Sequence, residues 1–152
     1  VHYDREGNFG GVSLNDEQLG TPVFVVTLDT YLAALAPDRR VGLMKVDVEG
    51  MERAVLAGSA GILTNDRPFL YVENDRVDAS PALIAWMREQ GYRLYWHCPL
   101  LYNPANFFQN REDRYPGIAA INILGVPNEI EFDTSGMSAV DAAGTHILRG
   151  KL

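Results

Sequence analysis

Three charged side chains alternate along one short apolar run of the sequence. Lys45, Asp47 and Glu49 occur within the stretch Met44-Lys-Val-Asp-Val-Glu-Gly50. A strand at this position would present all three on one face, and burying charge is costly unless the groups are paired or used. We therefore interpret the run as a strand that ends in a crevice, where the two carboxylates extend beyond the core and Lys45 balances their charge.

A second polar cluster follows the next apolar run along the chain. Glu73, Asn74 and Asp75 come directly after Phe69-Leu-Tyr-Val72. A right-handed crossover between the two runs would place Glu73 beside Asp47. The pair, with the Asn74 oxygen, has the ligand chemistry of a divalent-cation site, and alternatively one carboxylate with a raised pKa acts as a general base. A plainer interpretation also stays open, in which an acid caps the following helix and Glu73 is solvated.

His97 ends a third candidate strand and adds a titratable group. It lies among the aromatic residues Tyr95, Trp96 and Tyr102, and it is either a general base for an acceptor hydroxyl or a packed structural residue. The neighbouring Cys98 is the only cysteine, and we interpret it as a core residue because no partnered base is indicated.

Elements that alternate between strand and helix must position these residues. The sequence predicts strands over residues 23–27, 41–50, 67–75, 92–98 and 118–126, and helices over residues 28–36, 51–63 and 80–90. Pro37 ends the first helix, and the last has Ser80 at its N-cap, Pro81 at its first position and Gly91 just beyond its end.

This order indicates an α/β domain with a mainly parallel sheet and a final antiparallel strand. Ligands of such sheets bind beyond the carboxyl ends of the strands, where the polar residues lie. Residues 99–117 form a long loop, and its residues 103–115 are either an acceptor lid or surface packing. We place the catalytic domain at residues 1–129, and residues 130–152, rich in Ser, Ala, Gly and Thr, as a loosely packed tail.

Composition excludes several classes of partner. The net charge is −7, with two lysines and eleven scattered arginines, which argues against a nucleic-acid-binding surface. No apolar run approaches about 18 residues, so we expect no membrane span, and we expect a cytoplasmic protein.

Three blocks of the sequence also resemble a known enzyme family. "TLDTYL", "VGLMKVDVEGMERAVLAGSAGIL" and "RPFLYVEND" are similar to the core of FkbM-type methyltransferases, and the resemblance extends over roughly residues 21–129. It implies a Rossmann-like class I methyltransferase fold, S-adenosylmethionine as cofactor, and methyl transfer to a hydroxyl of a sugar, polyketide or similar small molecule. The catalytic candidates are then Asp47, Glu49 and Glu73, with His97 a lesser one. A resemblance to metal-dependent O-methyltransferases further implies Mg²⁺ held by Asp47, Glu73 and Asn74.

One part of the family pattern is not matched. The glycines of "DREGNFGGVSL" lack a strand before and a long helix after them, so we interpret this stretch as a turn-rich loop and assign no cofactor-binding residue. We expect the first strands of the fold, with the main cofactor contacts, to be absent from this chain. The strand at 41–50 would then be an exposed edge that favours homo-oligomers, and the isolated chain would bind S-adenosylmethionine weakly.

Two alternative functions follow from the same residues. Asp47-Val-Glu49 is an acid-x-acid motif of the kind a metal-dependent glycosyltransferase uses. In the second alternative, the chain is a non-catalytic α/β fragment that associates with other chains through its exposed sheet edge.

Overall fold

The computed structural model describes residues 2–3, 12–13 and 22–149. Two short strands, β1 (His2–Tyr3) and β2 (Val12–Ser13), pair antiparallel with each other. The glycine stretch of residues 6–11 lies outside the described residues. The main body consists of four helices and five strands: α1 (Leu28–Leu35), β3 (Leu43–Val46), α2 (Glu52–Ala57), α3 (Ala60–Asn65), β4 (Phe69–Glu73), α4 (Ser80–Glu89), β5 (Tyr92–His97), β6 (Asn122–Pro127) and β7 (Ser138–Ala139).

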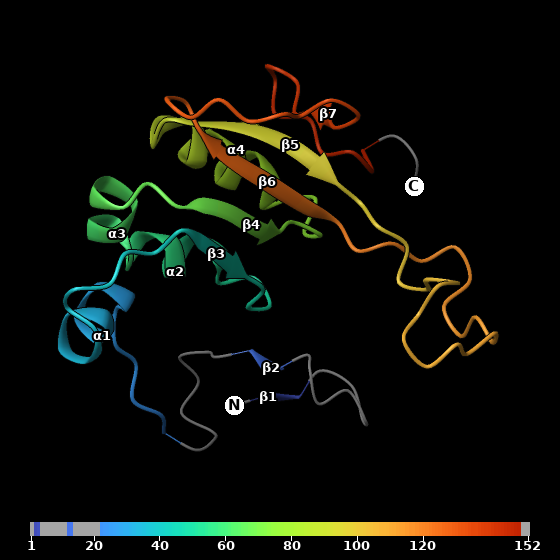
Figure 1. Cartoon of the computed structure of the whole chain (residues 1–152), viewed down its shortest axis with the longest axis horizontal. Coiled ribbons are helices and arrows are strands. Elements are labelled where there is room, and N and C mark those ends of the chain that lie inside the picture. The colour runs from blue at the N-terminus through green and yellow to red at the C-terminus, as the bar shows by residue number, and fades with distance from the viewer. Residues whose placement is uncertain (1, 4–11, 14–21, 150–152) are drawn as a thin grey trace.

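The five strands form one mixed sheet in the order β3-β4-β6-β5-β7. β3 and β4 are parallel, whereas β6 pairs antiparallel with both β4 and β5, and β7 pairs antiparallel with β5. The arrowheads of β3, β4 and β5 consequently point toward one end of the sheet and that of β6 toward the other (Figure 1). The α/β class and the antiparallel β5–β6 pair are confirmed.

The prediction of a mainly parallel sheet is wrong. The chain leaves β5 through the loop of residues 98–121 and returns as β6 between β4 and β5, not at the edge of the sheet. β4 and β5 run in the same direction and would pair in parallel, but β6 lies between them and pairs antiparallel with each. The resulting mixed α/β sheet is consistent with a Rossmann-like fold.

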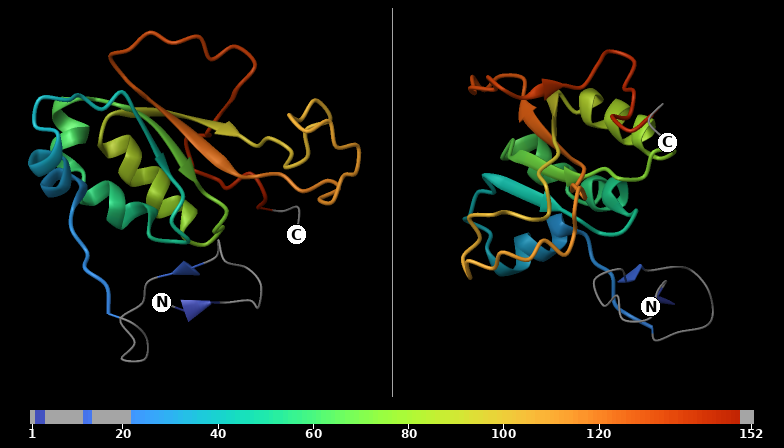
Figure 2. Two further views of the ribbon diagram at one scale, coloured as in Figure 1. Left: turned by 60° about the horizontal axis from the view of Figure 1, so that its bottom comes forward. Right: turned by 90° about the vertical axis from the view of Figure 1, so that its right-hand side faces the viewer.

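The sheet has one covered face and one open face. Met44, Val46, Leu70, Val72 and Trp96 point from the covered face into the core, together with Ile123 and Leu94. Helices α2, α3 and α4 pack on that face, contributing Leu56, Leu63, Ile84 and Met87 (Figure 2). At the opposite positions of the same strands, Lys45, Tyr71, Leu124 and Tyr95 are half-buried or exposed, whereas Asn122 and Val126 of β6 are buried.

Two local predictions differ from the structure. Residues 23–27 are extended but belong to no strand, and Phe24 and Val25 are exposed, because no described strand lies beside them to complete a hydrogen-bonded ladder. Ser80 is the first residue of α4 and not its N-cap, which is Ala79; its buried hydroxyl instead accepts a hydrogen bond from Asn74 Nδ2 at 2.8 Å.

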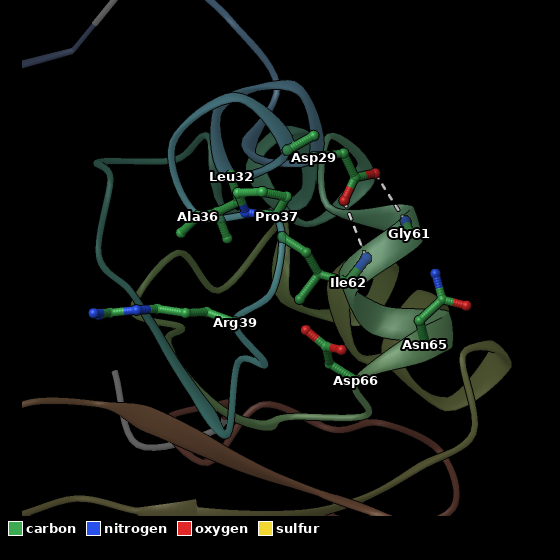
Figure 3. A pocket seen from close by; sticks show the side chains of 10 residues that line it. Asp29, Leu32, Ala36, Pro37, Arg39, Gly61, Ile62, Asn65 and Asp66 are labelled. Atoms are coloured by element: carbon green, nitrogen blue, oxygen red, sulfur yellow. Dashed lines mark hydrogen bonds between the residues drawn. The ribbon is translucent and has the colours of Figure 1, made fainter.

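The predicted helix of residues 51–63 is broken into α2 and α3, and Asp29 is the cause. Its carboxylate accepts hydrogen bonds from the backbone N–H groups of Gly61 (2.8 Å) and Ile62 (3.0 Å), drawn as dashed lines in Figure 3. In a continuous helix these groups would donate to the carbonyls four residues earlier. The carbonyl of Gly58 accepts from the Asp29 backbone N–H instead, at 3.2 Å. Hydrogen bonds in both directions therefore tie the start of α1 to the start of α3, and they replace the helical hydrogen bonds that would join α2 to α3.

The same tie explains the Thr-Leu-Asp block before α1. The Thr27 side chain caps α1 by accepting from the Thr30 backbone N–H at 3.2 Å, while Asp29, two residues later, caps α3. A cavity of about 320 Å³ lies between the two helices, with Asp29, Pro37 and Ile62 among its lining residues (Figure 3).

The segment after residue 130 carries more structure than its composition indicates. β7 pairs with β5, Val140 is buried, and His146 is 1% exposed. The His146 ring holds the segment: its Nε2 lies 2.7 Å from the backbone oxygen of Asn74, and its Nδ1 accepts from the Leu148 backbone N–H at 3.1 Å. No helix among the described residues is long and apolar enough to cross a membrane.

We predict that Asp29→Ala lowers the free energy of unfolding by about 1–2 kcal/mol, because the start of α3 loses its cap. Asp29→Asn, which keeps one carbonyl oxygen as acceptor, should lose less. Urea unfolding followed by circular dichroism measures both. Asp38→Ala, an exposed acid in the turn after α1, is the matched control and should change stability by less than about 0.5 kcal/mol. Equal losses at positions 29 and 38 would contradict the capping role.

Candidate functional site

Four polar side chains form a row across the ends of four adjacent strands. Glu73 and His97 both pair in register with Asn122 of β6, and Asp47 follows Val46, which pairs with Val72. Residues opposite each other on neighbouring strands share a face. Asp47, Glu73, Asn122 and His97 therefore occupy one edge of the open face, with Glu73 and His97 two strands, or roughly 10 Å, apart.

The structure brings Asp47 and Glu73 together, as the crossover argument predicts. Partial burial raises the pKa of Glu73 to about 7, and the neighbouring Asp47 charge and, less strongly, that of Asp75 act in the same direction. The pKa of Asp47 is lowered, first by a hydrogen bond from Lys45 and also by one with Glu73. The signs of these shifts assign the shared proton to Glu73, so that near neutral pH the pair consists of an ionised Asp47 and a half-ionised Glu73.

Lys45 contacts the outer carboxylate of this pair. Its Nζ lies 2.6 Å from Asp47 Oδ2, and this hydrogen bond raises the lysine pKa. The Lys45 and Asp47 side chains are 60% and 43% exposed, so the ion pair contributes little to stability. Its effect is local: it keeps Asp47 charged beside Glu73.

Glu49 lies outside the row. The chain leaves β3 at Val46 and turns, with left-handed backbone at Glu49 (φ 54°) and Gly50 (φ 96°). Glu49 Oε2 then lies 3.3 Å from Arg76 Nη2. The backbone angle at position 50 favours glycine, and a Cβ there would also approach Arg76 Nε to 2.8 Å, so that the arginine side chain would have to shift.

Asn74 is directed away from the carboxyl pair. It follows Glu73 and therefore lies on the covered side, where it is 4% exposed and its amide donates to Ser80. The described residues include no cluster of three or more His, Cys, Asp or Glu side chains suited to a metal ion. Because Asn74 is engaged in the helix layer and Asp47 in an ion pair, this arrangement does not fit the set of Asp47, Glu73 and Asn74 as Mg²⁺ ligands, and we derive no step through a metal.

His97 is exposed at the far end of the row, and its partner, Tyr71, was not among the predicted site residues. Its Nδ1 lies 2.8 Å from the hydroxyl of Tyr71, and the two ring centroids are 5.7 Å apart. Tyr71 lies two residues before Glu73 on β4, so strand alternation places them on one face. That spacing was the available signal for Tyr71. Asn122 carried none, because its place in the row depends on where β6 inserts.

Space for a ligand adjoins the edge on its helix side. A cavity of about 230 Å³ lies between the turn after β3 and the start of α4, and its lining includes Gly50, Glu73 and Arg76. The loop of residues 98–121 leaves from the same end of the sheet (Figure 1) and exposes Phe107 and Phe108. Cys98 is half-buried, and burial raises the pKa of its thiol, in keeping with a packing residue.

We predict that the half-buried Glu73 makes the fold less stable as pH rises. Its pKa is about 7 in the folded chain and 4.5 ordinarily, so between these values the folded chain holds a proton that the unfolded chain releases. Stability contributed by this group is present below about pH 4.5 and is lost as pH rises through about 7. Glu73→Gln has no such dependence. Urea unfolding at several pH values should show the variant gaining on the wild type across this range, and parallel curves would contradict the prediction.

Comparison with known proteins identifies the family. Residues 5–94, more than half of the chain, match the methyltransferase FkbM domain. The match includes β3, the turn at Gly50 and β4, which carry Asp47 and Glu73, and it gives no support to a glycosyltransferase. Searches of curated proteins and of solved structures returned no match. The matched stretch contains Asp47 and Glu73 but not His97 or Asn122, and the chain belongs to the FkbM methyltransferase family.

Proposed function

We propose that this chain catalyses S-adenosylmethionine-dependent O-methylation of a small hydroxylated acceptor, a sugar, polyketide or similar metabolite, with the Asp47–Glu73 pair as the proton acceptor. The observation that carries the proposal is that pair: two carboxyl groups in contact at the strand ends of a methyltransferase domain, one with a pKa near 7. A general base is most effective when its pKa lies near the working pH.

The residues of this edge fit the reacting end of the cofactor. When bound, S-adenosylmethionine supplies a methyl group on a cationic sulfonium, and the acidic side chains Asp47, Glu49, Glu73 and Asp75 gather at this edge. Their negative charge is complementary to that cation. The glycine stretch of residues 6–11 lies outside the described residues, and the prediction that the isolated chain binds S-adenosylmethionine weakly stays a prediction. Calorimetric titration with S-adenosylmethionine tests it, and micromolar binding would refute it.

Each member of the edge has a separate task. Ionised Glu73 accepts the proton of the acceptor hydroxyl as the new C–O bond forms and the C–S bond breaks. Asp47, kept charged by Lys45, raises the proton affinity of Glu73. Since the methyl carbon is already activated, positioning and proton removal are the main work left to the protein.

The remaining predictions about partners depend on this assignment. We propose a single small-molecule acceptor, no nucleic-acid partner, a cytoplasmic setting, and a homo-oligomer through the outer edge of β3. That edge has no paired neighbour among the described strands, and Leu43 on it is 62% exposed. Sizing chromatography tests the last point, and a monomer would exclude it.

We predict that Glu73→Gln lowers the rate of methyl transfer by about 10²- to 10⁴-fold, because it removes the general base. Asp47→Asn should also lower it, less steeply, because Asp47 acts through Glu73. The assay measures S-adenosylhomocysteine by mass spectrometry, with a panel of monosaccharides and hydroxylated polyketides as acceptors and the cofactor in large excess. Glu131→Gln, an exposed acid remote from the row, is the control. A wild-type rate in Glu73→Gln would remove Glu73 from the mechanism.

We predict that the rate also rises with pH through about 7, following ionisation of Glu73. Asp47→Asn removes the neighbouring negative charge, which is one cause of the raised pKa, so the midpoint of its pH profile should move to lower pH. The profile of kcat/KM between about pH 5 and 9 measures this shift. A flat wild-type profile, or an unchanged midpoint in the variant, would contradict the assignment.

A further inference from the structure

We propose that Tyr71 is a positioning residue for His97: its hydroxyl donates to Nδ1 and thereby fixes the imidazole with its proton on Nε2. In this tautomer His97 is a hydrogen-bond donor toward the acceptor, not a proton acceptor. The catalytic part of this inference rests on the proposed function; the tautomer does not.

The two rings meet across a strand that separates their own. Tyr71 of β4 pairs in register with Leu124 of β6, and His97 of β5 pairs with Asn122. The Tyr71 side chain therefore extends diagonally over β6 on the open face, and its Oη lies 2.8 Å from Nδ1 with the rings tilted by 59°. This is a normal hydrogen-bond length for a phenol and an imidazole nitrogen.

The direction of the hydrogen bond follows from the two groups. Tyr71 is partly buried, and burial raises its pKa above 10 despite the nearby Lys45, so the phenol keeps its proton. An imidazole nitrogen with a free lone pair is a stronger acceptor than a neutral phenol oxygen, so the O–H donates to Nδ1. A neutral imidazole carries one proton, which must then be on Nε2.

The assignment divides the labour of the row. Glu73 can accept a proton, whereas His97 can only donate a hydrogen bond, and the two lie on the same edge with Asn122 between them. An acceptor bound there is recognised at two points, through the hydroxyl that faces Glu73 and through a second oxygen that accepts from His97 Nε2.

His146 provides an internal reference for testing this tautomer. Its Nε2 faces a carbonyl oxygen, which only accepts, and its Nδ1 faces a backbone N–H, which only donates. Its proton is therefore on Nε2, the tautomer inferred for His97.

Nitrogen-15 NMR of the histidine rings in the full chain, at about pH 8 where an ordinary histidine is neutral, tests the proposal. The spectra of His97→Gln and His2→Gln assign the three histidines. We expect the His97 pattern to match that of His146 in the wild type. Tyr71→Phe should convert His97 to a mixture of tautomers and leave His146 unchanged. Tyr95→Phe, a half-buried tyrosine that also faces Leu124, is the matched control and should change neither.

Either of two results overturns the proposal: a proton on Nδ1 of His97 in the wild type, or a His97 pattern that Tyr71→Phe leaves unchanged. The wild-type spectrum decides the point even if Tyr71→Phe does not fold.

The methyl-transfer assay tests the role of the tautomer in catalysis. Glutamine at position 97 retains a donor near the place of Nε2, so His97→Gln should preserve more acceptor affinity, measured as a lower KM, than His97→Ala. Equal losses would show that His97 is not a donor to the acceptor. A correct tautomer with no detectable methyl transfer would refute the proposed function and leave the tautomer assignment intact.

Discussion

The hydrogen bonding of β6 on both of its sides is the constraint on which the rest of the structure depends. β6 is paired with β4 along one edge and with β5 along the other, so it fixes how far apart those two strands lie and in which register. Moving β6 by one residue would turn Asn122 to the covered face, and the fully buried Ile123, which faces Val72 and Trp96 in register, would lose its place in the core. Core packing therefore sets the register, and the register sets the spacing of Glu73 and His97. The candidate site is a consequence of how the hydrophobic face is packed.

The difference between the two faces of the sheet explains the electrostatics. On the covered face, helices bury an almost wholly apolar surface. On the open face, the Asp47 and Lys45 side chains remain partly hydrated, so they can stay ionised at small cost. Glu73 lies between these two environments, and its partial burial is the largest cause of its raised pKa. An acid that was fully exposed would titrate near its ordinary value, and one that was fully buried beside Asp47 would resist ionisation.

The sequence predicts local features better than features that depend on distant partners. The end of α1 before Pro37, the strand at β4 and the helix at α4 follow from local patterns, and the contact between Asp47 and Glu73 follows from the handedness of one crossover. The position of β6 could not be predicted, because an apolar strand fits equally well at an edge or between two others. The break between α2 and α3 could not be predicted for a similar reason: Asp29, which competes for the helix N–H groups, is about 30 residues away in the sequence. Glu49 left the predicted face because alternation ends where β3 ends, at Val46.

The buried ring of His146 gives the end of the chain a mechanical connection to the site. Its hydrogen bond is to the backbone oxygen of Asn74, the residue that follows Glu73, and β7 of the same segment is bonded to β5 beside Trp96. The segment thus contacts the ends of β4 and β5, which carry Glu73 and His97, from the side opposite the open face. A binding event on residues 138–149 would therefore act on those strand ends as well as on the hydrophobic core, to which the segment contributes Val140. Residues 138–149 contribute no side chain to the row of Asp47, Glu73, Asn122 and His97, but they help to fix the distance between the strands that carry it.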